Sequence, residues 1–340
     1  MLAQPSLEHP RQMRSGAIDF LRILGIAAVV AGHIGAWSGP VVRETVYTWH
    51  VPLFFFLSGY LWSEGRTVIQ EMNKRARTLL LPYLVWLLLV GAWWLSQLGV
   101  IHGQDIRKLI LGGSHVRGPL AAFWFVTALF VAVVAVRALQ RFPAWAQWTL
   151  SVGALVVTMR FPDLVARIPL AAGTGLACVV FVLAGREFKR HRTRIRRPLA
   201  TGLSILGGCA AVILLGWSTY LDLKYAQLGT PVMTVLVAIG VCAALVLIAE
   251  HLVPLLGPRA NAALSTLASC GFMVVLTHAV VLAELTRLGV APWLVFAASL
   301  AGPWLAALLI LRTGLAPVLL GVPVLAAAAP VRVGVGFSRS

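Results

Sequence analysis

Arg22 and His33, both in the first apolar segment, are the side chains whose types and spacing best suit chemistry. In a helix, eleven residues make three turns plus about 20°, so both side chains leave the same face, about 16 Å apart along the axis. Imidazole acts as a general base near neutral pH, and a guanidinium binds phosphate. Ionisable groups in an apolar span usually face a cavity or a partner. The pair therefore predicts the wall of a tunnel.

Each of these residues also has a simpler interpretation. Arg22 lies near the inner end of its segment and could snorkel to lipid phosphates, with Asp19 one turn away as its partner. A lone histidine in an apolar helix is often a hydrogen-bonded packing residue. The position of Arg22 and His33 on one face favours function over both alternatives.

Two more histidines fall at a similar depth once the apolar segments are given a direction. His50 lies at the outer mouth of the second segment, where the neighbouring Trp49 favours an interfacial position. His278 lies in the outer half of the ninth segment, where a packing role and a functional role are equally open. The three histidines could converge near the outer side.

Small and basic residues mark two further points. Ser58 and Gly59 favour close helix packing within the second segment. Lys74, Arg75 and Arg77 come just before the third segment, where they either set the membrane topology or form an anion site on the cytoplasmic side.

The chain that positions these residues has 340 residues, of which 59% are hydrophobic and only 11% charged. Soluble domains carry about 25% charged residues. We therefore expect an all-α, polytopic integral membrane protein, since apolar stretches of about 20 residues span a bilayer as helices. About ten such helices are predicted, at 18–38, 47–63, 79–99, 121–139, 144–159, 169–185, 199–217, 230–249, 264–284 and 292–311.

The net charge of +17 is explained chiefly by orientation. If the N-terminus is cytoplasmic, nineteen of the 28 Lys and Arg residues fall in inner segments and eight in outer ones. This predicts cytoplasmic N- and C-termini in a cell (plasma or inner) membrane, and removes the need for a nucleic-acid partner. The expected organisation is a tail at 1–17, a transmembrane domain at 18–312 and an apolar, interfacial segment with a basic tail at 313–340. The run 315–329 is more typical of an interfacial or re-entrant segment than of a span.

The four cysteines stand singly in apolar stretches, without the spacing of a metal site or a disulfide framework. No metal site is expected.

Several of these motifs, in this order, resemble the acyltransferase 3 family of integral membrane O-acyltransferases, especially its fucose 4-O-acetylase-like branch. The resemblance is strong over residues 18–130 and weaker over 260–280. It rests on Asp19–Arg22 followed by His33, on His50–Tyr60, on Arg75–Arg77 with Leu81–Tyr83, on Trp124-Phe125, and on Ser265 to His278. Met273-Val274-Val275 departs from the pattern, because an aromatic residue is common there.

The resemblance implies a ten-helix core that transfers an acyl group, most simply acetyl, from cytosolic acyl-CoA to a sugar hydroxyl of a glycan or glycolipid at the outer side. Acetyl-CoA would be a co-substrate, with no tightly bound cofactor. Arg22, Lys74, Arg75 and Arg77 would hold its phosphates. His33 would act as general base or form an acyl-His intermediate.

His278 or His50 would orient the imidazole of His33 or stabilise the oxyanion, and Trp124 at the outer mouth would stack on a sugar ring unless it only belongs to an aromatic belt. Two other classes remain open, a transporter or flippase with polar residues around a midplane cavity, and a lipid-interacting scaffold.

Overall fold

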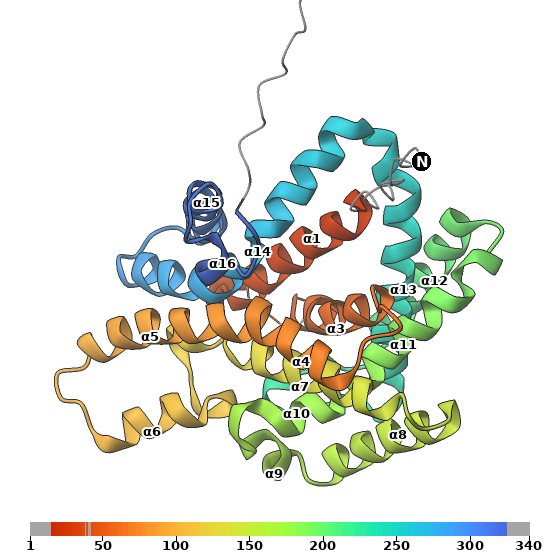
Figure 1. Cartoon of the computed structure of the whole chain (residues 1–340), viewed down its shortest axis with the longest axis horizontal. Coiled ribbons are helices and arrows are strands. Elements are labelled where there is room, and N and C mark those ends of the chain that lie inside the picture. Colours follow the sequence, from red (N-terminus) through yellow and green to blue (C-terminus); the bar gives the residue numbers. More distant parts are fainter. Residues whose placement is uncertain (1–14, 38, 40–41, 325–340) are drawn as a thin grey trace, which may run out of the picture.

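The structure, a computed structural model, describes residues 15–37, 39 and 42–324. The described chain consists of helices joined by turns and loops, and its only β contact is an isolated bridge between Asp222 and Gln227. Figure 1 shows the arrangement of the longer helices. They are α1 (Gly16–His33), α3 (His50–Tyr60), α4 (Val68–Arg75), α5 (Leu81–Ser96), α6 (Gly103–Leu111), α7 (Trp124–Leu139), α8 (Ala144–Arg160), α9 (Pro162–Arg167), α10 (Ala172–Ala177), α11 (Val179–His191), α12 (Pro198–Leu214), α13 (Met233–Leu252), α14 (Gly257–Arg287) and α15 (Pro292–Ile310).

The all-α, polytopic membrane class predicted from composition is confirmed. By length and composition, five helical stretches of the described chain can cross a bilayer, or six if the bent pair α10 and α11 forms one span. The number of ten and the cytoplasmic termini stay predictions. Residues 1–14 and 325–340 of the predicted tails lie outside the described residues. The five stretches are Gly16–His33, Val68–Ser96, Gly118–Leu139, Met233–Arg287 and Pro292–Ile310.

Several helices differ in length from the predicted spans. The second predicted span, 47–63, contains a helix of only 11 residues, α3, because the backbone breaks at Trp49 after a π-helical turn, Arg43–Tyr47. Its side chains are mostly buried in protein, so a short helix leaves few backbone groups facing lipid. The described part of 315–329 forms only the four-residue helix α16 (Ala316–Leu319), against α5.

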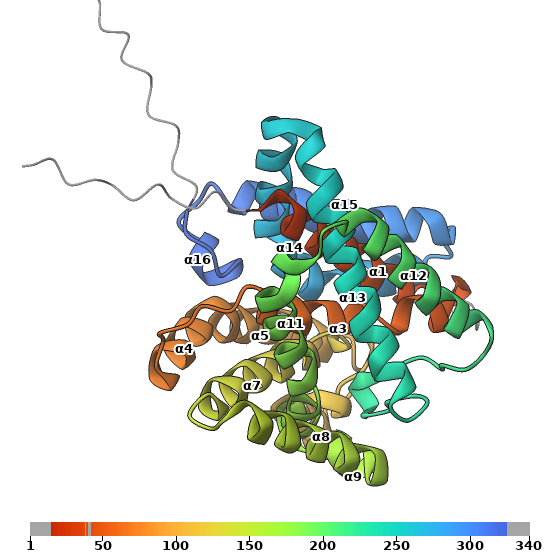
Figure 2. The same ribbon diagram turned by 90° about the vertical axis from the view of Figure 1, so that its right-hand side faces the viewer.

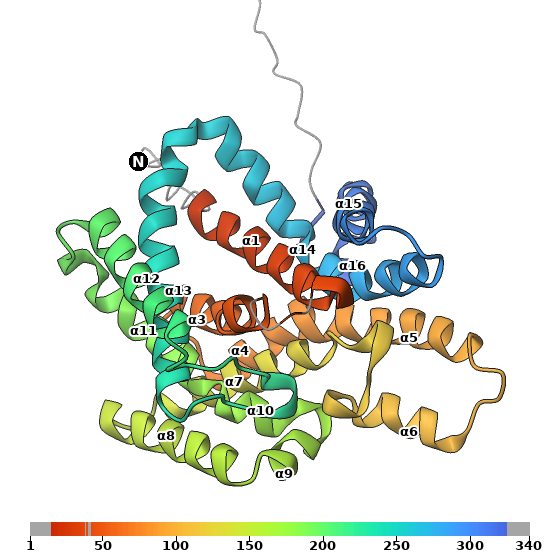
Figure 3. The same cartoon turned by 180° about the vertical axis from the view of Figure 1, so that it is seen from behind.

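The helix that carries Arg22 and His33 lies at the centre of the molecule. α1 packs against α14, α13 and α3 (Figures 1 and 3). α12 packs against α13, beside which it lies in Figure 2. In Figures 1 and 3, α13 lies between α12 and α1. α1 is therefore enclosed by protein on several sides, which is where polar side chains can be kept from lipid.

Glycine contacts bring α3 and α11 together. A Cβ atom on Gly59 would overlap the carbonyl oxygen of Val182, and one on Gly185 would overlap that of Phe56. The two backbones therefore touch reciprocally, as small residues allow in membrane helix pairs. This contact fixes α3, and with it Ser58 and His50, beside the core.

Replacing Gly59 with alanine is expected to destabilise the fold, because the added methyl group must push α3 away from α11. Overpacking of this kind costs about 1–3 kcal/mol. The yield of monodisperse protein and its melting temperature in detergent measure the effect. Gly207→Ala on α12 is the matched control, since its Cβ would meet nothing within 4 Å. Equal melting temperatures for the two variants would contradict the tight α3–α11 contact.

Candidate active site

Asp19 and Arg22 form an ion pair on α1. Nη1 of Arg22 lies 2.8 Å from Oδ1 of Asp19, and the hydroxyl of Ser265 donates to Oδ2 of Asp19 at 2.7 Å. Asp19 is buried and thereby links α1 to α14, while the Arg22 side chain stays 30% exposed. Asp19 holds Arg22 in place without covering its guanidinium.

Arg22 lies in a basic region with Lys74 and Arg75. These three side chains and Ser58 line two adjoining cavities of about 360 and 150 Å³, together called the cationic cavity. Arg77 is exposed and does not line it. Of the four cations expected to bind phosphate, the structure brings three together and leaves Arg77 apart.

A buried carboxylate that the sequence did not single out positions Arg75. Glu71 is 1% exposed and pairs with Nε of Arg75 at 2.9 Å, Nη2 of Arg137 at 3.0 Å and Nη1 of Arg66 at 3.4 Å. Three guanidinium groups around one carboxylate leave a net positive charge in this region. The signal for Glu71 was its spacing four residues before Arg75, which places both on one helix face.

The histidines converge at the other end of α1. The rings of His33 and His278 contact edge to face, with centroids 5.2 Å apart. His33 and His50 both line a second cavity of about 240 Å³, the histidine cavity. His50 and Trp124 are both buried in protein, and both line this cavity.

Backbone contacts fix the tautomer of all three rings. Nδ1 of His33 lies 2.7 Å from the carbonyl oxygen of Val29, four residues earlier, and His50 and His278 make the same contact at 2.7 and 3.0 Å. A carbonyl oxygen only accepts, so each Nδ1 carries the proton and each Nε2 has a lone pair. Nε2 of His278 is buried and has no hydrogen-bond partner among the described residues. The rings are therefore oriented to accept protons.

The loop between α12 and α13 adds charged groups to the histidine cavity that the sequence analysis missed. Asp222 and Lys224 both line it, and Nζ of Lys224 donates to the carbonyl oxygen of Val116 at 2.7 Å. Burial lowers the pKa of Lys224 to about 8, with Asp222 acting in the opposite direction, and burial raises the pKa of Asp222. At neutral pH Lys224 thus keeps most of its charge beside the histidines.

Tyr47, also missed, donates its hydroxyl to the carbonyl oxygen of Gly32 at 3.1 Å and contacts the His50 ring with centroids 4.9 Å apart. The available signal was its place three residues before His50 in the predicted span 47–63, since such residues share a face of a continuous helix, but the backbone breaks between them at Trp49. Lys224 had no such signal, since its loop is distant in sequence.

The cationic and histidine cavities adjoin each other along α1. Phe54, Phe125 and Val275 line both, so these side chains lie between the two. The Phe54 and Phe125 rings contact each other with centroids 5.3 Å apart. Arg22 and His33 therefore face two neighbouring cavities on one side of α1, in the order that the helix spacing predicts.

The structure is thus a multi-pass helical bundle with a basic cavity and a histidine cavity side by side on one buried helix, which places anion-binding cations next to groups that can accept a proton. The comparisons with known proteins give the family. A model of the acyltransferase 3 family, described as an acyltransferase domain, matches residues 15–322, and the chain belongs to this family of acyltransferases.

Two curated relatives share part of the chain. The nodulation protein NolL of Mesorhizobium japonicum is 28% identical over 157 residues, which are 42% of this chain and 41% of the relative. NolL of Sinorhizobium fredii is 25% identical over 197 residues, 54% of this chain and 52% of the relative. The chain thus matches about half the length of these relatives or less. No solved structure matches.

Proposed function

We propose that this acyltransferase moves an acetyl group from cytosolic acetyl-CoA to a sugar hydroxyl of a glycan or glycolipid at the outer side of a cell membrane. The observation that carries the proposal is the order of cavities along α1, with cations at Arg22 and Arg75 and imidazoles at His33 and His278. The cations suit binding of the coenzyme A phosphates, and the imidazoles suit proton transfer.

The donor enters at the cationic cavity in this proposal. Its phosphates bind Arg22, Lys74 and Arg75, and its thin pantetheine arm runs along α1 past Phe54 and Phe125. The arm is comparable in length with the Arg22–His33 separation, about 16 Å on an ideal helix. The thioester then lies in the histidine cavity.

The acceptor hydroxyl meets the thioester there. Nε2 of His33 takes the hydroxyl proton as the oxygen attacks the thioester carbonyl, and the carbonyl oxygen becomes an oxyanion. The intermediate collapses to the ester, and the coenzyme A thiolate leaves with the proton from His33. His278 orients the His33 ring through their edge contact, and the charge of Lys224 favours the oxyanion.

Release of free coenzyme A tests the function directly. The full chain in nanodiscs, supplied with acetyl-CoA and a glycoconjugate extract of the host membranes, is expected to release coenzyme A and to label the extract with radioactive acetyl. Protein-free nanodiscs are the control. No release above that control, with a folded protein, would overturn the proposal. In sealed proteoliposomes, movement of an unmodified glycan across the bilayer without coenzyme A release would instead identify a transporter.

A further inference from the structure

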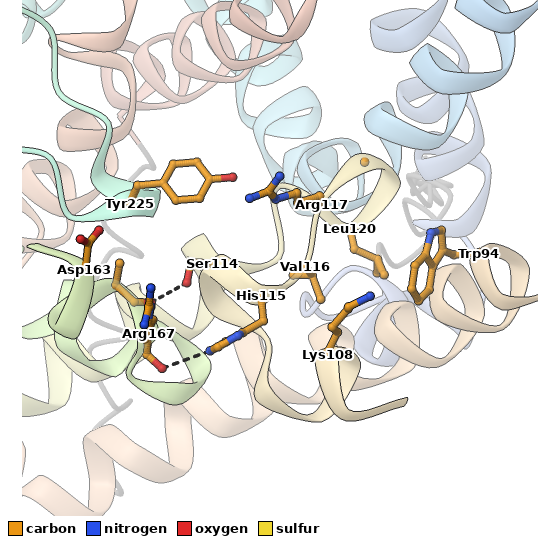
Figure 4. Close-up of a pocket in the computed structure, with 12 residues that line it drawn as sticks. Trp94, Lys108, Ser114, His115, Val116, Arg117, Leu120, Asp163, Arg167 and Tyr225 are labelled. Atoms are coloured by element: carbon orange, nitrogen blue, oxygen red, sulfur yellow. Dashed lines mark hydrogen bonds between the residues drawn. The ribbon is translucent and has the colours of Figure 1, made fainter. Parts of the chain in front are cut away.

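A third cavity, of about 710 Å³, opens beside the histidine cavity and plays no part in the chemistry above. It lies between the segment 108–120, α9 and the loop after α12, and is here called the loop cavity (Figure 4). Tyr225 lines both the loop cavity and the histidine cavity. Its volume falls in the range of about 300–1,000 Å³ typical of small-molecule sites. A ligand in the loop cavity therefore adjoins the histidines.

Hydrogen bonds hold the floor of the loop cavity in shape. The Ser114 hydroxyl donates to the carbonyl oxygen of Ala166 at 2.6 Å, and Nε2 of His115 donates to that of Arg167 at 3.1 Å. Both contacts join the segment after α6 to α9, as Figure 4 shows. Two segments about 50 residues apart in sequence thus form the cavity, and hydrogen bonds hold them against each other.

Basic side chains outnumber acidic ones in the lining of the loop cavity. It contains Lys108, Arg117 and Arg167 against one acid, Asp163. In the described part of the chain, no carboxylate forms a salt bridge with Arg117 or Arg167, whereas Lys108 pairs with Asp105 at 3.0 Å. The two guanidinium groups are therefore available to a ligand, and a guanidinium binds phosphate and carboxylate through paired donors.

Membrane topology does not account for these charges. Outer segments normally hold few Lys and Arg residues. Yet five of the eight basic residues on the predicted outer side line the histidine or the loop cavity. They are Arg43, Lys108, Arg117, Arg167 and Lys224. A gathering of outer cations around two joined cavities is what an anionic ligand would require.

Aromatic rings lie at both ends of the loop cavity. Trp94 lines one end of the loop cavity and Tyr225 the other, where the Tyr225 side chain extends toward that of Arg117 (Figure 4). Trp and Tyr combine a flat apolar face with a polar tip. Such faces suit the C–H faces of sugar rings, while the cations between them suit a charged substituent.

We propose that the loop cavity binds the acceptor as a negatively charged saccharide, with a phosphate or carboxylate at Arg117 and Arg167 and sugar rings against Trp94 and Tyr225. This inference rests on the proposed function, because the reactive hydroxyl then reaches past Tyr225 toward His33. It narrows the acceptor class from any glycan to an anionic one, either a phosphate-linked saccharide or an acidic saccharide.

Binding without an acyl donor tests the site separately from catalysis. The probes are methyl glucoside, methyl glucuronide, methyl glucoside 6-phosphate and glycerol 3-phosphate, titrated by calorimetry into the full chain in phosphatidylcholine nanodiscs. We expect at least one charged glycoside to bind about tenfold or more tightly than methyl glucoside. Equal affinities for neutral and charged glycosides would overturn the proposal. Binding of glycerol 3-phosphate as tight as that of the sugar phosphate would assign the site to a lipid headgroup and also overturn it.

Variants locate the effect. The double variant R117Q/R167Q is expected to bind the charged glycosides no better than methyl glucoside. R117K/R167K is expected to retain only part of the difference, because lysine keeps the charge but not the paired donors. Arg287→Gln is the matched control, because Arg287 is an exposed cation paired with Glu284 and lines neither cavity. Loss of affinity in Arg287→Gln equal to that in the double variant would place the binding elsewhere and overturn the assignment.

An acetyl-transfer assay on fractionated acceptors is the second test. The host glycoconjugate extract is separated on an anion-exchange column, and each fraction is incubated with the protein and radioactive acetyl-CoA. Label in the retained fraction supports an anionic acceptor, and label only in the unretained fraction overturns it. If neither fraction is labelled, the proposed function is wrong. The calorimetric titrations then decide by themselves whether the loop cavity binds an anionic saccharide. Mild acid hydrolysis of the labelled material, which cleaves glycosyl phosphates, then separates the two anionic classes: label that is no longer retained on the column indicates a phosphate-linked saccharide, and label that is still retained indicates an acidic one.

Discussion

Alanine at position 33 is expected to lower kcat for acyl transfer by about 10²–10⁴-fold, the usual contribution of a positioned general base. His33 holds its proton on Nδ1, against the carbonyl oxygen of Val29, so Nε2 is the atom that accepts a proton in the histidine cavity. His278 contacts the ring but adds a second imidazole in the same tautomer, not a replacement at the same position. The measurement is the initial rate of coenzyme A release with saturating donor.

His191→Ala is the matched control for His33→Ala, because His191 is exposed and pairs with Glu187 at 2.6 Å, in a different part of the chain. Its kcat should equal that of the unmodified protein. His278→Ala should lower kcat less than His33→Ala, since it acts through the His33 ring. A folded His33→Ala variant with a near-normal rate would falsify the assignment of His33 as the base.

The same variant distinguishes two chemical routes. Incubation with radioactive acetyl-CoA and no acceptor, followed by rapid denaturation with detergent at neutral pH, traps an acyl-His intermediate if one forms, because an acyl-imidazole is hydrolysed quickly in acid. Label on the unmodified protein that is lost in His33→Ala indicates covalent catalysis. Unlabelled protein with normal turnover indicates base catalysis alone.

The features of this site that the sequence predicted are those determined within one helix. Arg22 and His33 share a face of α1 because eleven residues nearly complete three turns, and both face cavities in the structure. The tilt of Asp19 toward Arg22 follows from the same geometry. Local periodicity depends only on the chain itself, so it can be calculated without the fold.

Features that depend on packing between distant segments could not be predicted. The sequence allowed His278 to approach His33, but only the packing of α14 on α1 brings the rings into contact. Lys224 reaches the histidine cavity from a loop nearly 200 residues after α1. No sequence pattern predicts which residues far apart in the chain come into contact, because many helix arrangements bury the same apolar faces.

Sequence alone also does not predict which of two neighbouring arginines, Arg75 and Arg77, faces a cavity. A basic run before a span predicts cations near the cytoplasmic surface, but not which of them faces inward. The α-helix α4 ends at Arg75, and a π-helical segment, Ala76–Leu80, follows. Arg75 lines the cationic cavity and pairs with Glu71, whereas Arg77 is exposed.

Arg75→Gln is therefore expected to raise KM for acetyl-CoA by about 10–100-fold, the equivalent of about one hydrogen bond to a charged group, while kcat stays within about threefold. Arg77→Gln, the matched control two residues away, should leave both constants unchanged. Steady-state rates over a range of acetyl-CoA concentrations measure the two parameters. Equal effects of the two substitutions would mean that the cationic cavity does not hold the donor phosphates.

A donor without phosphates separates binding from structure. Loss of Arg75 also removes one partner of the buried Glu71, which Arg137 and Arg66 still neutralise. If Arg75 acts on phosphate, the unmodified protein and Arg75→Gln should use S-acetylpantetheine, which carries no phosphate, equally well. If Arg75 instead only stabilises the fold around Glu71, the variant should transfer acetyl more slowly from both donors. A displaced α4 would then obstruct the path past Ser58 and Phe54 for any thioester, with or without phosphates.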